Sequence, residues 1–438
     1  MTQTPRPDPY APTSGDLRYG VLHYDLDLTY RMATNRLDGV ATITGRAHEK
    51  LRSFTLDLIG LKAQKVRLNG EKRTSYRQGA RTLTIKPAAP IEAGAEFTVQ
   101  IRYSGSPAPR NSRWGKVGWE ELDDGVLVAS QPVGAPTWFP CDDRPSDKAR
   151  YRITVEVEEG YTVVAPGLLT EHTRSSGRGR WTYVEQIPTC TYLVAVHIGR
   201  YRSEDWDLAG VPGGVHYPGA LRPQVHAALA GMPAMMRLFE RCFGPYPMAR
   251  YDVVITEDAL EIPLEAQAMA VFGSNFLDGA WATQRLIAHE LAHQWFGNSV
   301  GLARWHDIWL NEGLACYSEW LWSQASGGLS CQEQALKHWT LLSGLPQDIT
   351  VGDPGPDLMF DDRVYKRGAL TVHALRHAVG DEVFFTILHA WTAARRHGFG
   401  TTAAFEALAE EQSGRPLGGL FSLWLDETPL PPFPRTGH

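Results

Sequence analysis

Hydrophobic and polar residues alternate along most of the chain between about residues 19 and 201. A period of two in segments rich in Thr, Val and Tyr predicts strands. Turn-forming sequences such as Leu68-Asn69-Gly70 separate these segments. We therefore expect an antiparallel β-sandwich or saddle over residues 19–205, preceded by a loose arm over residues 1–18. The clearest strand segments are HYDLDLTY (23–30), FTLDL (54–58), TLTIK (82–86), FTVQIRY (97–103) and YRITVEV (151–157).

Apolar residues recur at helical intervals after a Gly- and Pro-rich join at 210–223. Two strand-like segments, YDVVITED (251–258) and AVFGSN (270–275), remain near the start of this half. The pattern predicts an α+β multidomain chain whose second domain, residues 206–438, is mainly helical. Helices are expected at 224–244, 281–297, 308–326, 366–380, 381–398, 402–414 and 420–428, and several of these segments end at a glycine.

Composition narrows the class of protein. With 438 residues, of which 43% are hydrophobic and 21% charged, the chain is too long for one core and too apolar to be disordered. A net charge of −6 argues against nucleic acid as a partner. The sequence contains neither a long apolar run nor a secretory leader, so no membrane partner is expected. An odd number of scattered cysteines favours reduced thiols in the cytoplasm, whereas the oligomeric state is left open.

The segment His289-Glu290-Leu291-Ala292-His293 lies inside a predicted helix. A spacing of four places both imidazoles on one face, where two nitrogens can bind one metal ion. Zinc in a hydrolase takes three protein ligands and keeps one position open for water. Glu312 follows His293 after 18 intervening residues, enough for a turn and a second helix that returns. We therefore predict one Zn²⁺ per chain, bound by His289, His293 and Glu312.

Two further carboxylates belong to this motif by their spacing. Glu290 lies between the two histidine ligands, where a carboxylate can sit beside a metal-activated water as a general base. Glu319 lies two helical turns after Glu312, and it could accept the second N–H of a ligand imidazole. A simple surface carboxylate is the alternative for Glu319.

A second pair of histidines, His373 and His377, also has a spacing of four on a predicted helix. The residues between them, Ala374-Leu375-Arg376, include no acid, and the sequence offers no plausible third ligand. We therefore predict a structural or surface role for this pair.

The metal motif is similar to that of a known family. HELAHQWFGN (289–298) followed by WLNEGLACYSE (309–319) resembles the aminopeptidase N family of gluzincin zinc metallopeptidases, which includes leukotriene hydrolase. The resemblance implies a thermolysin-like catalytic domain, with the same zinc ligands and base as above. It extends to SQPVGAPTWFPCDDRPSDKARYRITV (130–155), TYLVAVHIGRY (191–201) and VYKRGA (364–369).

The resemblance also implies roles that spacing alone does not reveal. Tyr365 would donate a hydrogen bond to the oxyanion that develops during the reaction. Glu265, helped by Gln131, would bind the free α-ammonium group of a peptide. The family's loop reads Gly-Ala-Met-Glu-Asn, whereas this chain has IPLEAQ over 262–267. Pro263 removes a backbone donor and Ala266 removes a side-chain amide, so both departures concern substrate binding.

These residues predict a zinc aminopeptidase that acts on peptides with a free N-terminus. One alternative is a zinc epoxide hydrolase or bifunctional enzyme, which would need a long apolar tunnel. Another is an inactive metal-bearing scaffold, which would lack a ligand or the base. Family members usually continue into a helical C-terminal domain, and we expect a two-domain form without it and with a more open active site. The preferred N-terminal residue is left open.

Overall fold

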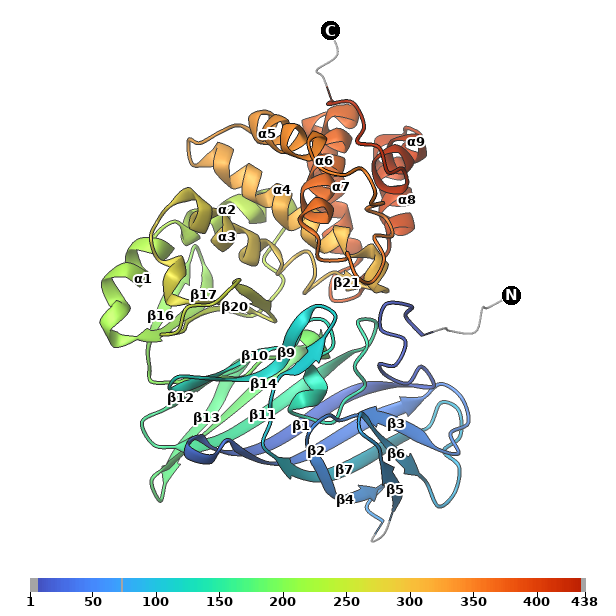
Figure 1. Ribbon diagram of the computed structural model, residues 1–438, viewed down its shortest axis with the longest axis vertical. Coiled ribbons are helices and arrows are strands. Elements are labelled where there is room, and N and C mark those ends of the chain that lie inside the picture. The colour runs from blue at the N-terminus through green and yellow to red at the C-terminus, as the bar shows by residue number, and fades with distance from the viewer. Residues whose placement is uncertain (1–6, 72–73, 435–438) are drawn as a thin grey trace. The chain divides into compact units, whose positions relative to one another are not determined.

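The computed structural model describes residues 7–71 and 74–434, and the chain forms two compact units. The first unit contains the chain up to Asp205 together with 214–222 and 249–274, and the second contains the remainder. Strands dominate the first unit and helices the second (Figure 1). The predicted α+β architecture, with a β-rich N-terminal domain before a helix-rich domain, is confirmed. The predicted boundary between residues 205 and 206 stays a prediction.

The described strands of the first unit form one large, mostly antiparallel sheet and several smaller sheets (Figure 1). The large sheet has the order β13 (Leu168–Ser175), β14 (Arg178–Cys190), β11 (Lys148–Glu158), β1 (Tyr19–Arg31), β2 (Arg36–Ala47), β7 (Glu96–Gly105), β4 (Lys62–Leu68). A second sheet has the order β12 (Thr162–Val164), β15 (His197–Gly199), β10 (Gly125–Ala129), β9 (Gly115–Leu122), β8 (Arg110–Ser112). A third has the order β3 (Phe54–Asp57), β6 (Thr82–Lys86), β5 (Ser75–Gln78).

The central strand β1 explains why the alternating pattern folds as it does. Tyr24, Leu26 and Leu28 are buried, and the intervening Asp25 and Asp27 are only partly buried. Fully burying one such apolar side chain contributes about 1.5–3 kcal/mol. Because the side-chain period is two, this gain fixes the register of β1 against its antiparallel neighbour β2 and its parallel neighbour β11.

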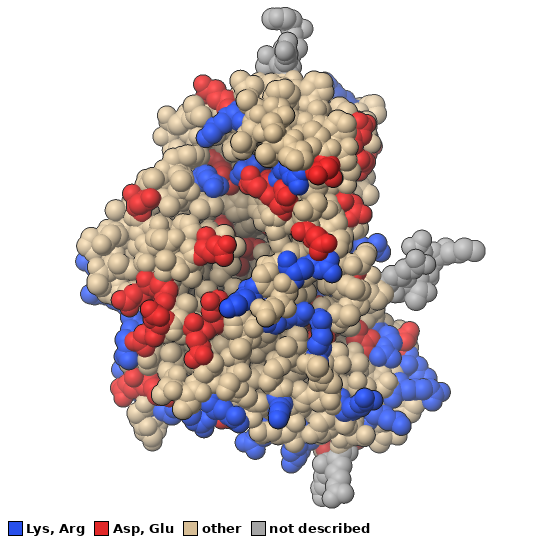
Figure 2. All heavy atoms as spheres, viewed as in Figure 1, with Lys and Arg blue, Asp and Glu red and all other residues tan. Residues whose placement is uncertain are grey.

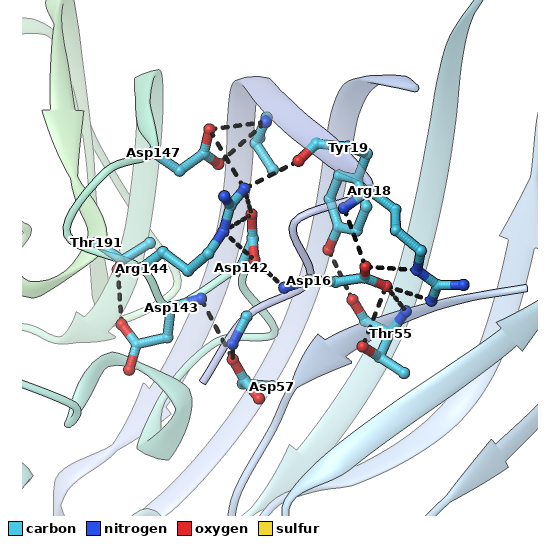
Figure 3. Close-up of polar contacts among 12 residues, drawn as sticks. Asp16, Arg18, Tyr19, Thr55, Asp57, Asp142, Asp143, Arg144, Asp147 and Thr191 are labelled. Carbon is cyan, nitrogen blue, oxygen red and sulfur yellow. Dashed lines mark hydrogen bonds and ion pairs between the residues drawn. The ribbon is translucent and has the colours of Figure 1, made fainter. Parts of the chain in front are cut away.

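A network of polar contacts surrounds the start of β1 (Figure 3). The Asp16 backbone N–H donates to Asp142 Oδ1 at 2.7 Å, and the Asp16 carboxylate accepts from the Thr55 N–H at 3.0 Å. Arg144 binds the Asp142 carboxylate and also donates to the Tyr19 carbonyl at 2.9 Å. These contacts join Asp16, a residue of the expected N-terminal arm, to β3 and to the segment before β11. Residues 1–6 of that arm lie outside the described residues.

A further sheet carries the segment that contains Glu265. Its order is β16 (Tyr201–Leu208), β17 (Val211–Pro218), β18 (Tyr251–Ile255), β20 (Met269–Phe272), β19 (Leu264–Ala266). The strand-like patterns at 251–258 and 270–275 correspond to β18 and β20. Glu265 lies opposite Ala270 in the antiparallel pair of β19 and β20, which fixes the backbone that bears its carboxylate.

Helices make up most of the described part of the second unit, and their tight packing includes the fully buried Trp295, Trp309, Trp320 and Trp391. A short parallel pair, β21 (Gly301–Leu302) and β22 (Phe399–Gly400), lies among them. The helices are α1 (Arg222–Leu229), α2 (Met232–Phe243), α3 (Trp281–Ala292), α4 (Trp309–Ala325), α5 (Cys331–Ser343), α6 (Asp362–Val379), α7 (Asp381–Ala394), α8 (Thr402–Ser413) and α9 (Gly418–Phe421).

The helix that carries the histidine motif ends earlier than its pattern predicts. α3 ends at Ala292, with His293 as its C-cap, although the apolar spacing continues to Gly297. Gly297 has a φ of +121°, which turns the chain back, and its N–H donates to the Val300 carbonyl at 2.9 Å. This turn begins the return of the chain towards α4.

Helices α4 and α6 approach each other through two glycines. A Cβ atom on Gly313 would lie 2.8 Å from the carbonyl carbon of Gly368, which is too close for two real atoms. The two backbones are therefore in direct contact, one residue after Glu312 on α4 and three residues after Tyr365 on α6. This contact sets the spacing between the helix with the predicted third ligand and the helix with the predicted catalytic tyrosine.

We expect the Gly313→Ala substitution to lower the free energy of unfolding by about 1–3 kcal/mol, because the new methyl group overpacks this contact. Urea unfolding of both proteins measures the difference. Gly419→Ala is the matched control, since Gly419 is a helical glycine with open space around it. That control is expected to be neutral or stabilising by up to about 1 kcal/mol. Equal effects of the two substitutions would contradict the close contact.

Both signs of charge occur on the visible face of each unit (Figure 2). Across the large sheet several charges form ion pairs, such as Arg31 with Asp38 at 2.6 Å, and each exposed pair contributes about 0–1 kcal/mol. Among the described residues, no helix has both the length and the apolar character that crossing a bilayer requires.

Candidate active site

The two histidines of the motif project from the last turns of α3 into the interior of the second unit. His289 is 6% exposed and His293 is 1% exposed. Their ring centroids are 4.7 Å apart and their planes are inclined by 80°. This arrangement follows from the helical spacing of four, which stacks one imidazole above the other.

Helix α4 brings Glu312 to the same point. Glu312 Oε2 lies 3.5 Å from His289 Nε2 and 3.4 Å from His293 Nε2, and Glu312 is 2% exposed. Burial by itself would raise the pKa of this carboxyl, but the two imidazoles lower its pKa to about 2. Glu312 is therefore an ionised acceptor in a buried site.

The other nitrogen of each imidazole has its own partner. His289 Nδ1 lies 2.9 Å from Glu319 Oε1, and His293 Nδ1 lies 3.0 Å from the Phe296 carbonyl oxygen. A carbonyl oxygen and an ionised carboxylate only accept, so each Nδ1 carries a proton, and Nε2 is the nitrogen of each ring that faces Glu312 and would bind a metal ion. The hydrogen bonds thereby fix the tautomer that a metal ligand needs.

The three donors fit a zinc ion. Ligands that bind zinc tetrahedrally at about 2.0–2.1 Å lie about 3.3 Å from one another, close to the separations between Glu312 Oε2 and the two Nε2 atoms. Two neutral imidazoles and one carboxylate form a ligand set of catalytic zinc sites, which leave a fourth position open. The predicted set of His289, His293 and Glu312 is confirmed as the zinc site of this chain.

Glu319 is held by two cations in addition to its contact with His289. Arg285 Nη1 lies 3.0 Å from Glu319 Oε2, and the Lys366 ammonium is close enough to act on its charge. Burial by itself would raise the pKa of Glu319, but Lys366 and His289 contribute most to lowering its pKa to about 2. Glu319 is thus a buried, ionised carboxylate instead of a surface one.

Arg285 and Lys366 were not singled out in the sequence. Arg285 precedes His289 by four residues, so the same helical spacing that identified the ligands could have placed it on their face. Lys366 gives no such signal, because it reaches Glu319 only through the packing of α6 against α4. Its ammonium also lies 3.5 Å from Cys316 Sγ, in the turn of α4 before Glu319.

The predicted base and the predicted tyrosine both belong to the second unit. Glu290 lies on α3 between the two histidine ligands and is 4% exposed. Tyr365 lies in the first turn of α6 and is half-buried. Its ring centroid is 6.1 Å from that of His289, with the planes inclined by 19°. The structure therefore brings Tyr365 beside a metal ligand.

The two residues predicted to bind an amine contact each other in the first unit. Gln131 Nε2 donates to Glu265 Oε1 at 2.6 Å, although 134 positions separate them. Both side chains are partly buried. Of the two departures from the family loop, Pro263 is buried directly before β19, and Ala266 is 4% exposed at the end of that strand.

Comparisons with known proteins agree with this geometry. The Peptidase family M1 domain matches residues 227–424, and the Peptidase M1 N-terminal domain matches residues 21–193. The M1 zinc metallopeptidase of Deinococcus radiodurans, solved as a mutant with a Tyr-Ser-Ala substrate, is 30% identical with a TM-score of 0.90. That match covers 97% of this chain and 98% of the other.

Curated relatives include Aminopeptidase M1 of Arabidopsis thaliana, which is 29% identical over 70% of this chain. Leucyl aminopeptidase of Saccharolobus solfataricus is 25% identical over 83% of it. The chain spans 37% and 48% of the lengths of these two proteins.

A β-rich domain, a helical domain and a buried His-His-Glu site together define a zinc metallopeptidase. This chain belongs to the M1 peptidase family, as the resemblance of its motifs predicted.

Proposed function

We propose that this chain is a zinc aminopeptidase, which removes the N-terminal residue from peptides that have a free amino group. The observation that carries the proposal is the convergence of two imidazoles and one ionised carboxylate in a member of the M1 family. The names of its curated relatives and the peptide bound to the Deinococcus enzyme support this substrate class.

His289, His293 and Glu312 would hold the zinc ion. A zinc ion bound there supplies Lewis acidity, which polarises a carbonyl group and lowers the pKa of water to about 7. Glu290 is proposed as the general base: its carboxylate accepts a proton from the attacking water and later donates it to the leaving nitrogen. Its position between the two ligands on α3, out of bulk water, supports this role.

Tyr365 is proposed to stabilise the transition state. Its phenolic O–H would donate a hydrogen bond to the oxygen that becomes negative as the carbonyl group is attacked. The position of its ring beside His289 and the close α4–α6 contact three residues further along α6 support this role. Because the hydrogen bond strengthens as charge develops, its effect falls on kcat more than on substrate binding.

Glu265 is proposed to bind the α-ammonium group of the substrate, with Gln131 holding its carboxylate in one orientation. The 2.6 Å hydrogen bond between them supports this pairing. A carboxylate that recognises a free amine makes the enzyme cut one residue from the end of a peptide. The partner molecules proposed for the chain are therefore short peptides or unfolded N-termini.

A panel of aminoacyl fluorogenic amides, each paired with its N-acetylated counterpart, tests the proposed function. We expect cleavage of the free amines and little cleavage of the blocked ones. Glu265→Ala should lower kcat/KM for free amines by about 10–10²-fold, because a charge-assisted contact is worth about 1.5–3 kcal/mol. Glu261→Ala, on the exposed segment before β19, is the matched control. Equal cleavage of acetylated substrates would contradict amine recognition by Glu265.

Glu319 is proposed to orient His289 and raise its basicity as a ligand. We expect Glu319→Gln to weaken zinc binding by about 10–100-fold, because a neutral amide is a weaker acceptor for Nδ1–H. Competition with a chelator measures the affinity. Glu411→Gln, at an exposed helical position on α8, should leave the affinity unchanged. An unaltered affinity in Glu319→Gln would mean that Glu319 serves only the packing of α3 and α4.

We also propose a cytoplasmic location. The cysteines of the chain, Cys141, Cys190, Cys242, Cys316 and Cys331, are all buried and form no disulfides, which suits a reducing compartment. Cell fractionation with an antibody against the chain tests this location, and recovery outside the cytoplasm would contradict it.

A further inference from the structure

The histidine pair of α6 reproduces the arrangement of the zinc ligands on α3. The ring centroids of His373 and His377 are 4.6 Å apart and their planes are inclined by 73°. The corresponding values for His289 and His293 are 4.7 Å and 80°. Two helices of the same unit therefore present a pair of imidazoles in nearly the same geometry.

A third possible metal-ligand atom, from a residue of α5, lies next to this second pair. Gln332 Oε1 lies 2.8 Å from His373 Nε2 and 2.7 Å from His377 Nε2. Glu312 occupies the equivalent place in the zinc site, with its oxygen facing both Nε2 atoms. The sequence offered no third ligand for His373 and His377 because Gln332 lies 41 positions earlier and reaches them only in the folded chain.

We propose that His373 Nε2, His377 Nε2 and Gln332 Oε1 form a second metal site, which binds a divalent transition-metal ion such as Zn²⁺, Cu²⁺ or Ni²⁺. Imidazole nitrogen with one oxygen donor suits these borderline ions better than Mg²⁺ or Ca²⁺. A neutral amide attracts a cation less than the carboxylate of Glu312 does, so the second site binds more weakly than the first. The proposal does not depend on the proposed peptidase activity.

The surroundings allow both imidazoles to act as ligands. Burial is the largest factor that lowers the pKa of His373, to about 3, and it also lowers the pKa of His377. Both rings are therefore neutral near pH 7, and each donates its Nε2–H to the Gln332 oxygen, so binding of a metal ion at Nε2 has to move the ring proton to Nδ1. His373 Nδ1 lies 3.4 Å from the Tyr317 hydroxyl, which can accept the ring proton once Nε2 binds a metal. The positive charge of the neighbouring Arg376 is paired with the Asp381 carboxylate through two hydrogen bonds of 2.8 Å.

A small movement of Gln332 completes the site. Ligands of a tetrahedral zinc ion lie about 3.3 Å apart, so the amide oxygen has to withdraw by about half an ångström. Gln332 and His377 are partly exposed, which permits this movement and gives an ion a path from solvent. Gln332 lies in the first turn of α5, whereas the histidines lie on α6. A bound ion would therefore link the two helices.

Zinc-binding stoichiometry of the full chain tests the proposal. The protein is first loaded with one equivalent of zinc, and free zinc is then raised from the micromolar to the millimolar range in equilibrium dialysis. We expect the wild-type chain to bind a second ion and His377→Ala to bind only the first. Because His377 is partly exposed, this variant is expected to fold, which its thermal unfolding curve verifies.

Gln332→Glu provides a gain of binding as a second measurement. It gives the site two histidines and one carboxylate, the ligand set of the first site, and should tighten the second dissociation constant by about tenfold or more. A wild-type chain that binds a single zinc ion over the whole range would overturn the proposal, whatever Gln332→Glu does. A second ion that survives His377→Ala would overturn it as well, because that ion binds elsewhere.

Discussion

Replacing Glu290 with glutamine is expected to lower kcat by about 10²–10⁴-fold while the protein keeps one zinc ion per chain. The substitution preserves the size of the side chain on α3 but removes its ability to accept a proton. Glu290 is not one of the three converging ligands, so the donor set of His289, His293 and Glu312 stays intact. Steady-state kinetics on an aminoacyl amide, together with metal analysis of the same sample, measures both quantities.

Glu382→Gln is the matched control for this experiment, since Glu382 is exposed in the first turn of α7. Its kcat should equal that of the wild type. If Glu290→Gln retains wild-type turnover, another group handles the proton and the proposed mechanism is wrong. If the variant loses zinc as well as activity, Glu290 contributes to metal binding, and the role of base alone is also contradicted.

Removing the hydroxyl group of Tyr365 should have the next largest effect. We expect Tyr365→Phe to lower kcat by about 10²–10³-fold, the range found when one oxyanion donor is removed. KM should change much less, because the hydrogen bond is made mainly in the transition state. The phenyl ring keeps its place beside His289, so zinc affinity and stability should be close to those of the wild type.

Tyr76→Phe is the matched control, because Tyr76 is 37% exposed on the β-rich unit. A rise in KM with unchanged kcat in Tyr365→Phe would assign the hydroxyl to substrate binding instead. A parallel loss in both tyrosine variants would indicate a general effect on folding.

Local spacing explains which parts of the molecule were predictable from the sequence. The period of two in β1 and the spacing of four in α3 are properties of single elements, and they identified the β-rich half and the two histidine ligands. Glu312 could be predicted as the third ligand because a turn and a returning helix are common after such a motif. Only the family resemblance predicted roles for Tyr365, Glu265 and Gln131, since their partners are far away in the sequence.

Contacts between helices explain what the sequence did not reveal. Lys366 lowers the pKa of Glu319 only because α6 packs against α4. The need for glycine at position 313 becomes evident only from its close contact with Gly368. Helix α5 was not singled out, although Ser330 and Glu333 form a capping box at its start. Without α5 in place, Gln332 had no evident relation to the second histidine pair.

The contact between Gly313 and Gly368 limits how this enzyme can evolve. Backbone meets backbone there, so no rotamer change can loosen or retune the distance between the third zinc ligand and the tyrosine. We therefore expect substitutions at Gly313 or Gly368 to disturb the spacing of the zinc ligand and the tyrosine, and substitutions that alter substrate preference alone to lie at other positions.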